Sequence, residues 1–178
     1  MKILGIDIGF SQCGLCFLDK DNVESYMLTA NTGKPTKSKQ LPFLKEIFFD
    51  NREKRDMLIN YIYLADLVCI EKPFNIKGFG TALYELLGII KYICIDYKTQ
   101  FCEIPQTTLK KMATGKGNAK KSEMVMKAYK EFGHEAGSED EIDAFWVAIA
   151  GDILLSGNKS MGFSKARMDS LKKLEIQG

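Results

Sequence analysis

The sequence predicts an α/β fold in which a mixed β-sheet is covered by helices. Three observations lead to this prediction: three consecutive strand-like segments at the N-terminus, a helical pattern after them, and then an alternation of strand and helix. The 178 residues suit one domain, and a composition of 46% hydrophobic and 27% charged residues is typical of a packed globular protein. We place this domain at residues 1–156 and a polar C-terminal tail at 157–178.

The N-terminal segment reads as an antiparallel meander of three strands. The predicted strands are residues 2–8, 13–19 and 23–29, all rich in apolar and β-branched or aromatic side chains. Gly9 and the polar cluster 19–22 supply the turns between them.

The middle of the chain predicts a helix followed by a buried strand. Apolar residues recur near helical spacing from Leu44 to Ile62, and we expect this helix to break or fray within residues 50–55. Residues 66–71 contain the short apolar run Leu-Val-Cys-Ile, which suits a fully buried strand, and Pro73 prevents its ladder from continuing. Glu71 therefore lies at the carboxyl end of a strand.

The second half of the chain alternates between helix and strand. We predict helices at 81–96, 119–132 and 140–155 and a strand at 100–104. The polar tail from Gly157 onward is expected to be loosely held.

Neither a membrane span nor a disulfide framework is expected. No apolar run approaches the roughly 20 residues that cross a bilayer, and Asp7 interrupts the stretch that a signal peptide would need. We therefore expect an intracellular, cytoplasmic protein. The five cysteines are odd in number and sit mostly among apolar neighbours, so buried reduced thiols are expected. Cys13 and Cys16 lack the second ligand pair of a zinc site, because the chain has a single histidine.

The basic residues are unevenly distributed. The formal net charge is only +2, but residues 105–131 contain seven lysines against two glutamates, while the rest of the chain has a slight acidic excess. Such a segment is compatible with a polyanionic partner or with an ordinary solvated helix face. Charge alone does not separate the two interpretations.

Four acidic residues stand where acids are unusual. Asp7 lies in an otherwise apolar strand, and Glu71 ends a buried one. Asp140 and Asp143 are three residues apart at the start of a helix, so their carboxylates share one face. Each has an ordinary explanation, such as Asp7 pairing with a lysine or Asp140 capping its helix. Together, carboxylates without a His or Cys cluster suit a hard cation such as Mg²⁺, and two ions could drive phosphodiester hydrolysis.

The motifs of this chain resemble those of the RuvC family of Holliday junction resolvases, within the ribonuclease H-like nucleases. The similar segments follow the family's order: residues 5–9 (Gly-Ile-Asp-Ile-Gly) with Gly14, residues 70–74 (Ile-Glu-Lys-Pro-Phe), residues 105–110 with 114–121, and residues 140–144 (Asp-Glu-Ile-Asp-Ala). They extend over nearly the whole domain.

The resemblance implies a ribonuclease H-like sheet of five strands, the three-strand meander plus two more, and a DNA endonuclease activity. Its implied metal ligands and catalytic residues are Asp7, Glu71, Asp140 and Asp143, binding two Mg²⁺ ions for which Mn²⁺ is an expected substitute. Its implied DNA-binding residues are Phe74, Lys110, Lys111, Gly115, Lys116, Gly117, Lys120 and Lys121. The expected reaction is paired nicking of four-way junctions by metal-activated water, which leaves 5′-phosphate and 3′-hydroxyl ends. Phe74 would stack on a base near the junction centre, with core packing as the alternative.

Some features depart from the family pattern. Ile8 stands where the family usually has proline, the helix after Phe74 differs, and the tail after Gly157 has no counterpart. A stand-alone, phage-type enzyme that cuts several branched DNAs and a strict junction resolvase that works with a branch-migration motor therefore stay open. A bacterial or phage-infected cell is the expected setting.

The predicted helix at 81–96 suggests a homodimer. One apolar stripe is formed by Leu83, Leu86, Leu87, Ile90 and Cys94 and is widened by Ala82, Ile89 and Ile93. One sheet cannot cover a stripe of this width, and a two-fold symmetric dimer suits paired incisions in a junction.

Three alternative functions share individual features of this sequence. An actin-like or sugar-kinase ATPase also begins with Asp-x-Gly after a strand, but it needs two subdomains for which this chain lacks room. A phosphate-binding P-loop fails because no Gly-Lys-Ser/Thr follows the required spacing around Gly115. A non-catalytic protein that binds branched DNA is the main alternative. His134 is expected to be a surface residue, with a role in proton transfer as the alternative. Lys72 is expected either to contact the scissile phosphate or to pair with an acid.

Overall fold

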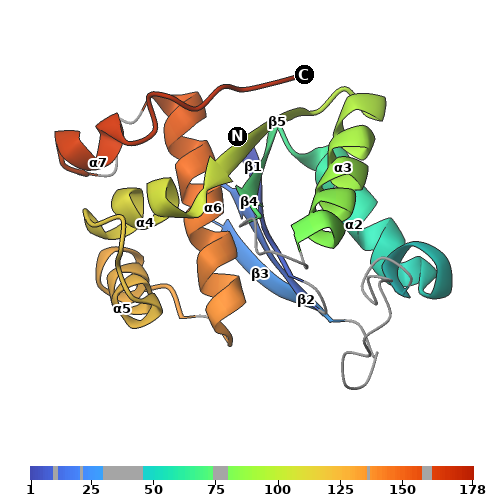
Figure 1. Ribbon diagram of the computed structural model, residues 1–178, viewed down its shortest axis with the longest axis horizontal. Coiled ribbons are helices and arrows are strands. Elements are labelled where there is room, and N and C mark those ends of the chain that lie inside the picture. The colour runs from blue at the N-terminus through green and yellow to red at the C-terminus, as the bar shows by residue number, and fades with distance from the viewer. Residues whose placement is uncertain (10–11, 21, 30–45, 74–79, 136, 158–161) are drawn as a thin grey trace.

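The computed structural model describes residues 1–9, 12–20, 22–29, 46–73, 80–135, 137–157 and 162–178. Five strands form one mixed sheet in the order β3-β2-β1-β4-β5 (Figure 1). Strands β1 (Lys2–Ile8), β2 (Gln12–Asp19) and β3 (Asn22–Thr29) form the predicted antiparallel meander, and β4 (Leu67–Lys72) and β5 (Gln100–Pro105) extend it in parallel with β1. The α/β fold class and its five-stranded sheet are confirmed.

The alternation of side chains along β1 divides the core into two layers. Ile3 packs with α6 (Glu139–Ser156) on one face of the sheet. Leu4 and Ile6 pack with α2 (Arg52–Leu64) and α3 (Gly80–Asp96) on the other. Figure 1 shows α6 on one side of the sheet and the α2–α3 pair on the other. Because side chains alternate with period two, Asp7 shares the α6 face with Ile3.

Two glycines allow α6 to lie directly on the sheet. A Cβ at Gly5 would fall on the carbonyl oxygen of Ala144 and within 2.5 Å of the Ala148 nitrogen. A Cβ at Gly14 would fall on the carbonyl of Asp140, 2.6 Å from its carbon. The motif formed by residues 5–9 and Gly14 therefore supplies Asp7 and also leaves the space that α6 needs.

The boundaries of several helices differ from the predictions. The expected break near residues 50–55 is confirmed: a π-helical turn, η1 (Glu46–Asp50), is separated from α2 by Asn51, whose side chain accepts a hydrogen bond from the Lys54 amide. Helix α5 (Lys121–Phe132) begins two residues later than predicted, after an extended Lys120.

Helix α4 (Gln106–Thr114) was not predicted. It follows β5 without a loop and buries Leu109, Met112 and Ala113. Its first turn contains β-branched Thr107 and Thr108, which have modest helix propensity, so its stability depends on this tertiary burial.

The expectation of a loosely held tail is wrong for residues 162–178. A short helix, α7 (Lys165–Asp169), buries Arg167, and Leu171 joins the core beside α6. Near the end of the chain, Gln177 exchanges two backbone hydrogen bonds of 2.8 Å with Phe101 on the edge strand β5. The tail is polar in composition, but Arg167, Leu171 and Gln177 attach it to the rest of the domain.

The apolar stripe of α3 is covered within the chain. Leu83, Leu86, Leu87, Ile90 and Cys94 are all buried in the core layer that α2 and α3 form with the sheet. This observation removes the argument for a dimer that was based on the stripe. The five cysteines are free and buried, as predicted. Within the described ranges, no helix is both long and apolar enough to cross a membrane.

Candidate metal centre

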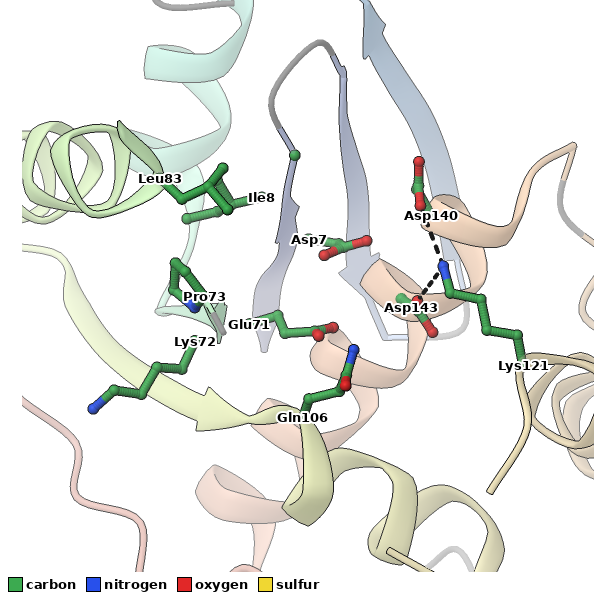
Figure 2. Close-up of a pocket in the computed structure, with 11 residues that line it drawn as sticks. Asp7, Ile8, Glu71, Lys72, Pro73, Leu83, Gln106, Lys121, Asp140 and Asp143 are labelled. Carbon is green, nitrogen blue, oxygen red and sulfur yellow. Dashed lines mark hydrogen bonds and ion pairs between the residues drawn. The ribbon is translucent and has the colours of Figure 1, made fainter. Parts of the chain in front are cut away.

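The sheet brings two acids together at the carboxyl ends of neighbouring strands. Strands β1 and β4 run parallel with Ile6 beside Ile70, so the next residues, Asp7 and Glu71, lie side by side on the face that α6 covers. Asp143 reaches the same point from α6, and ligand oxygens of these three acids all lie within 4.8 Å of one another. Figure 2 shows the three carboxylates converging on one pocket, whose volume is about 220 Å³.

The position of Asp143 follows from local features of the sequence. Ser138 caps α6 by accepting a hydrogen bond from the Glu141 amide, and the Glu141 carboxylate in turn accepts from the Gly137 amide. This reciprocal cap fixes where the helix begins. Gly14 lies opposite Asp7 on β2 and leaves room for the first turn of α6, which therefore places Asp143 against the sheet.

Asp140 lies at the rim of the group. It lines the same pocket but is outside the set of three close acids, and its side chain is 25% exposed. Its carboxylate accepts a hydrogen bond from the Gln12 amide. The structure thus brings three of the four predicted acids into mutual contact range and leaves the fourth beside them.

Lys121 contributes an ammonium group to the acids. Its Nζ lies 3.0 Å from Asp143 and 3.5 Å from Asp140 (Figure 2), with Glu139 at 3.7 Å. In contrast, Lys72 pairs with Glu103 at 3.5 Å, on the outer side of the pocket. The ion-pair interpretation therefore holds for Lys72, whereas Lys121, predicted as a DNA contact, binds the acids in this structure.

Burial and mutual repulsion disfavour the charged forms of these acids in the absence of a further cation. Burial, followed by the charges of Glu71, Asp143 and Asp140, raises the pKa of Asp7 to about 8. Burial and the charge of Asp143 raise the pKa of Glu71 to about 7. Burial also raises the pKa of Asp143, although Lys121 opposes it. The ammonium groups of Lys121 and, more weakly, Lys110 do not offset the effect of burial and mutual repulsion on these carboxylates.

The residues present fit a hard divalent cation. Glu71 Oε2 is buried and has no hydrogen-bond partner among the described residues, so a ligand position is directed into the pocket and left open. The close donors are all carboxylate oxygens, which Mg²⁺ prefers over nitrogen or sulfur ligands. Asp7, Glu71 and Asp143 would hold the ion, with Asp140 available at the rim.

The basic segment borders this centre. Lys110 on α4 lies close enough that its charge lowers the pKa of both Glu71 and Asp143 against the effect of burial. Gly115 adopts a left-handed φ of 87° and ends α4. Exposed lysines 111, 116 and 120 follow along α4 and the turn to α5, and Gly117 lies in that turn. Phe74 lies outside the described residues.

Two glutamines near the acids were missed by the sequence analysis. Gln12 donates to Asp140, and Gln106, the first residue of α4, extends its amide toward Glu71 and lowers the pKa of that acid (Figure 2). No sequence pattern predicts that these glutamines contact acids, because each glutamine is distant in the sequence from its acid and only the fold brings them together. His134 is half-buried and stacks on Phe145 with ring centroids 4.0 Å apart, so it is less exposed than expected and does not line the pocket.

Comparison with known proteins agrees with this fold. No protein-family model matches the chain. It is 27% identical over 159 residues to the crossover junction endodeoxyribonuclease RuvC of Synechococcus sp. strain WH7803, covering 85% of this chain and 97% of that protein. It is 28% identical over 160 residues to the RuvC of Brachyspira hyodysenteriae, covering 84% and 92%.

Solved structures show the same similarity. Thermus thermophilus RuvC superposes with a TM-score of 0.61 at 15% identity, covering 88% of this chain and 97% of that one. The same protein in complex with a Holliday junction substrate superposes with a TM-score of 0.60 at 14% identity, covering 84% and 91%. The chain is therefore similar to RuvC proteins in sequence and in fold, which confirms the resemblance that its motifs indicate.

Proposed function

From this similarity to RuvC in sequence and fold, we propose that the chain is a metal-dependent endonuclease that resolves four-way DNA junctions. The observation that carries the proposal is the convergence of Asp7, Glu71 and Asp143 within 4.8 Å, beside a lysine-rich segment. A protein that only binds DNA gains nothing from buried carboxylates placed next to phosphates. The nuclease domain corresponds to residues 1–156, to which the tail 157–178 is attached.

The acids divide the work by position. Asp7, Glu71 and Asp143 would hold Mg²⁺, and Asp140 at the rim would offer a further oxygen ligand, which a second ion could use. The chemistry that Mg²⁺ would supply at these acids is activation of a water and stabilisation of the leaving oxygen of the phosphodiester. Gln106 and Gln12 orient Glu71 and Asp140 through their amides.

The basic segment brings the phosphate backbone to the acids. Lys110, Lys111, Lys116 and Lys120 contact phosphates, and the amides around Gly115 and Gly117 allow close approach of the backbone. Lys121, whose Nζ lies beside Asp140 and Asp143, would also be in place to contact a phosphate near the cut. Phe74 stacks on a base at the junction centre.

The proposal is tested by cleavage of an end-labelled mobile four-way junction beside a linear duplex of the same sequence, with Mg²⁺ or with EDTA. We expect paired nicks in opposite strands of the junction with Mg²⁺, none with EDTA, and little cutting of the duplex. Mn²⁺ is expected to replace Mg²⁺. Tight binding of the junction without any cutting under either metal would contradict the nuclease and favour the binding protein.

Paired nicks need two active sites, and we propose that a homodimer provides them. The surface that supports this proposal lies at the ends of α2 and α3, where Tyr63, Leu64, Tyr92, Ile95 and Tyr97 are 39% to 67% exposed. The rings of Tyr63 and Tyr97 touch with centroids 5.8 Å apart, so exposed residues at the end of α2 and just after α3 meet on this surface. Clustered exposed apolar side chains of this kind are typical of an interface between protein chains.

The combined substitutions Tyr92→Glu and Ile95→Glu should convert the dimer to a monomer, because two charges on each copy would be buried against each other. Sedimentation at micromolar concentration should show the change, and the two nicks in a junction should lose their coupling. Val23→Glu, at an apolar residue on β3 that is 40% exposed, is the control outside this surface. A wild-type protein that is monomeric with and without junction DNA would contradict the dimer.

A further inference from the structure

Arg167 is the only buried lysine or arginine in the described part of the chain, with 9% of its surface exposed. It belongs to α7, in the C-terminal segment to which neither the metal centre nor the proposed DNA contacts assign a role. Burying a guanidinium is costly unless its N–H groups all find acceptors. The partners of Arg167 therefore show what the burial achieves.

The guanidinium binds the end of α4. Its Nε donates to the Met112 carbonyl at 2.5 Å, and its Nη2 donates to the Ala113 carbonyl at 2.7 Å. Carbonyls in the last turn of a helix lack partners within the helix, and a positive charge there also complements the helix dipole. Arg167 thus acts as a side-chain cap for α4 from a distant part of the chain.

The same group binds the last turn of α5. Nη1 and Nη2 donate to the two carboxylate oxygens of Glu131 at 2.9 and 2.8 Å, a bidentate arrangement that fixes the guanidinium plane. The guanidinium carbon Cζ lies 3.8 Å from the centre of the Phe163 ring and 6.0 Å from that of Trp146 on α6. One rigid side chain therefore joins α4, α5 and the tail and packs against α6.

These two helices carry the lysines beside the metal centre. The turn between them, residues 115–120, has exposed lysines at both ends. A guanidinium that binds one carboxylate through two hydrogen bonds and two carbonyls at the same time restricts how far these partners can move relative to one another. The contact therefore ties the last turn of α4, directly before residues 115–120, to the last turn of α5, beside the packing of both helices in the core with α6.

We propose that Arg167 is a positioning residue for DNA binding: through α4 and α5 it holds the lysine-rich turn in the place where phosphates are engaged. This inference rests on the proposed function of that turn, and it assigns the C-terminal segment a role in substrate affinity. Arg167 itself touches neither DNA nor the acids.

The test compares Arg167→Met with Leu171→Ala. Both residues are buried in the same segment. The Leu171 side chain packs in the core and has no donor for the α4 carbonyls, so its truncation removes packing alone. We expect Arg167→Met to raise the Kd for the four-way junction about tenfold, with an unchanged cutting rate at saturating junction. The slope of log affinity against log salt should also fall by about 2, since each lost phosphate contact removes about 0.9.

Glu131→Gln is the second variant, because it weakens the link to α5 and leaves the α4 carbonyls bound. Its effect on Kd should be smaller and should not add to that of Arg167→Met. Amide hydrogen exchange provides a readout without DNA: Arg167→Met should accelerate exchange in residues 112–120 and leave β1 and β4 protected.

An unchanged Kd in Arg167→Met, or an equal rise in Leu171→Ala at matched loss of stability, would overturn the inference. A wild-type protein that neither binds nor cuts the junction would refute the proposed function instead. In that case, accelerated exchange confined to residues 112–120 would still support the positioning role, and uniform acceleration would refute it.

Discussion

Asp7→Asn should abolish junction cleavage and yet make the metal-free protein more stable. Asp7 is held among Glu71, Asp143 and Asp140, and burial together with these charges raises its pKa to about 8. A neutral amide of the same shape removes both the repulsion and the burial of a charge. Since one pKa unit corresponds to about 1.4 kcal/mol and the amide must still be buried, we expect a gain on the order of 2 kcal/mol in EDTA at pH 8.

The dependence of stability on pH should change in the same variant. In the metal-free wild type, the raised pKa values mean that the folded state binds more protons than the unfolded state above about pH 4. Stability should therefore fall as pH rises from about 5 to about 8. Asp7→Asn should flatten this decline, because one of the protons bound only in the folded state is gone.

Mg²⁺ should stabilise the wild type at pH 8 and leave Asp7→Asn nearly unchanged, because the ion binds only the folded acids. Urea unfolding with EDTA or Mg²⁺ across this pH range measures all three effects. Asp56→Asn, at an exposed acid on α2, is the control and should shift stability by less than about 0.5 kcal/mol. A destabilised Asp7→Asn, or one that Mg²⁺ still stabilises, would refute the assignment of Asp7 as a ligand.

Gly14→Ala should damage both the stability of the chain and its metal centre. The added methyl group would collide with the backbone of Asp140, which cannot rotate away as a side chain can. Either α6 lifts from the sheet or the strand shifts, and overpacking of this kind costs about 1–3 kcal/mol or more. Because α6 carries Asp140 and Asp143, affinity for Mg²⁺ should fall by at least about tenfold.

The matched control is Gly88→Ala on the exposed face of α3, where a Cβ has nothing within 4 Å. There, replacing glycine by alanine inside a helix should stabilise by about 0.5–1 kcal/mol. Chemical unfolding and Mg²⁺ titration followed by calorimetry measure both variants. Equal behaviour of the two substitutions would show that the contact between Gly14 and α6 has no structural importance.

The sequence by itself determined the elements that local pattern controls. The meander of β1 to β3, the buried strand β4 and the helices α3, α5 and α6 follow from periodicity and turn residues. Asp7 and Glu71 could be singled out because a charged residue in an apolar strand needs a partner. Their convergence was predictable from the rule that carboxyl ends of neighbouring parallel strands gather functional groups.

The tertiary structure alone decided which groups become neighbours. The close fit of Gly14 to α6 brings Asp143 into the cluster and leaves Asp140 at the rim, and Gln106 reaches Glu71 only because α4 starts directly after β5. The role of Arg167 was invisible in a polar tail, since the carbonyls it binds are 55 and 54 residues away in the chain. Hydrogen bonds and packing between distant residues depend on coordinates, and no local pattern encodes them.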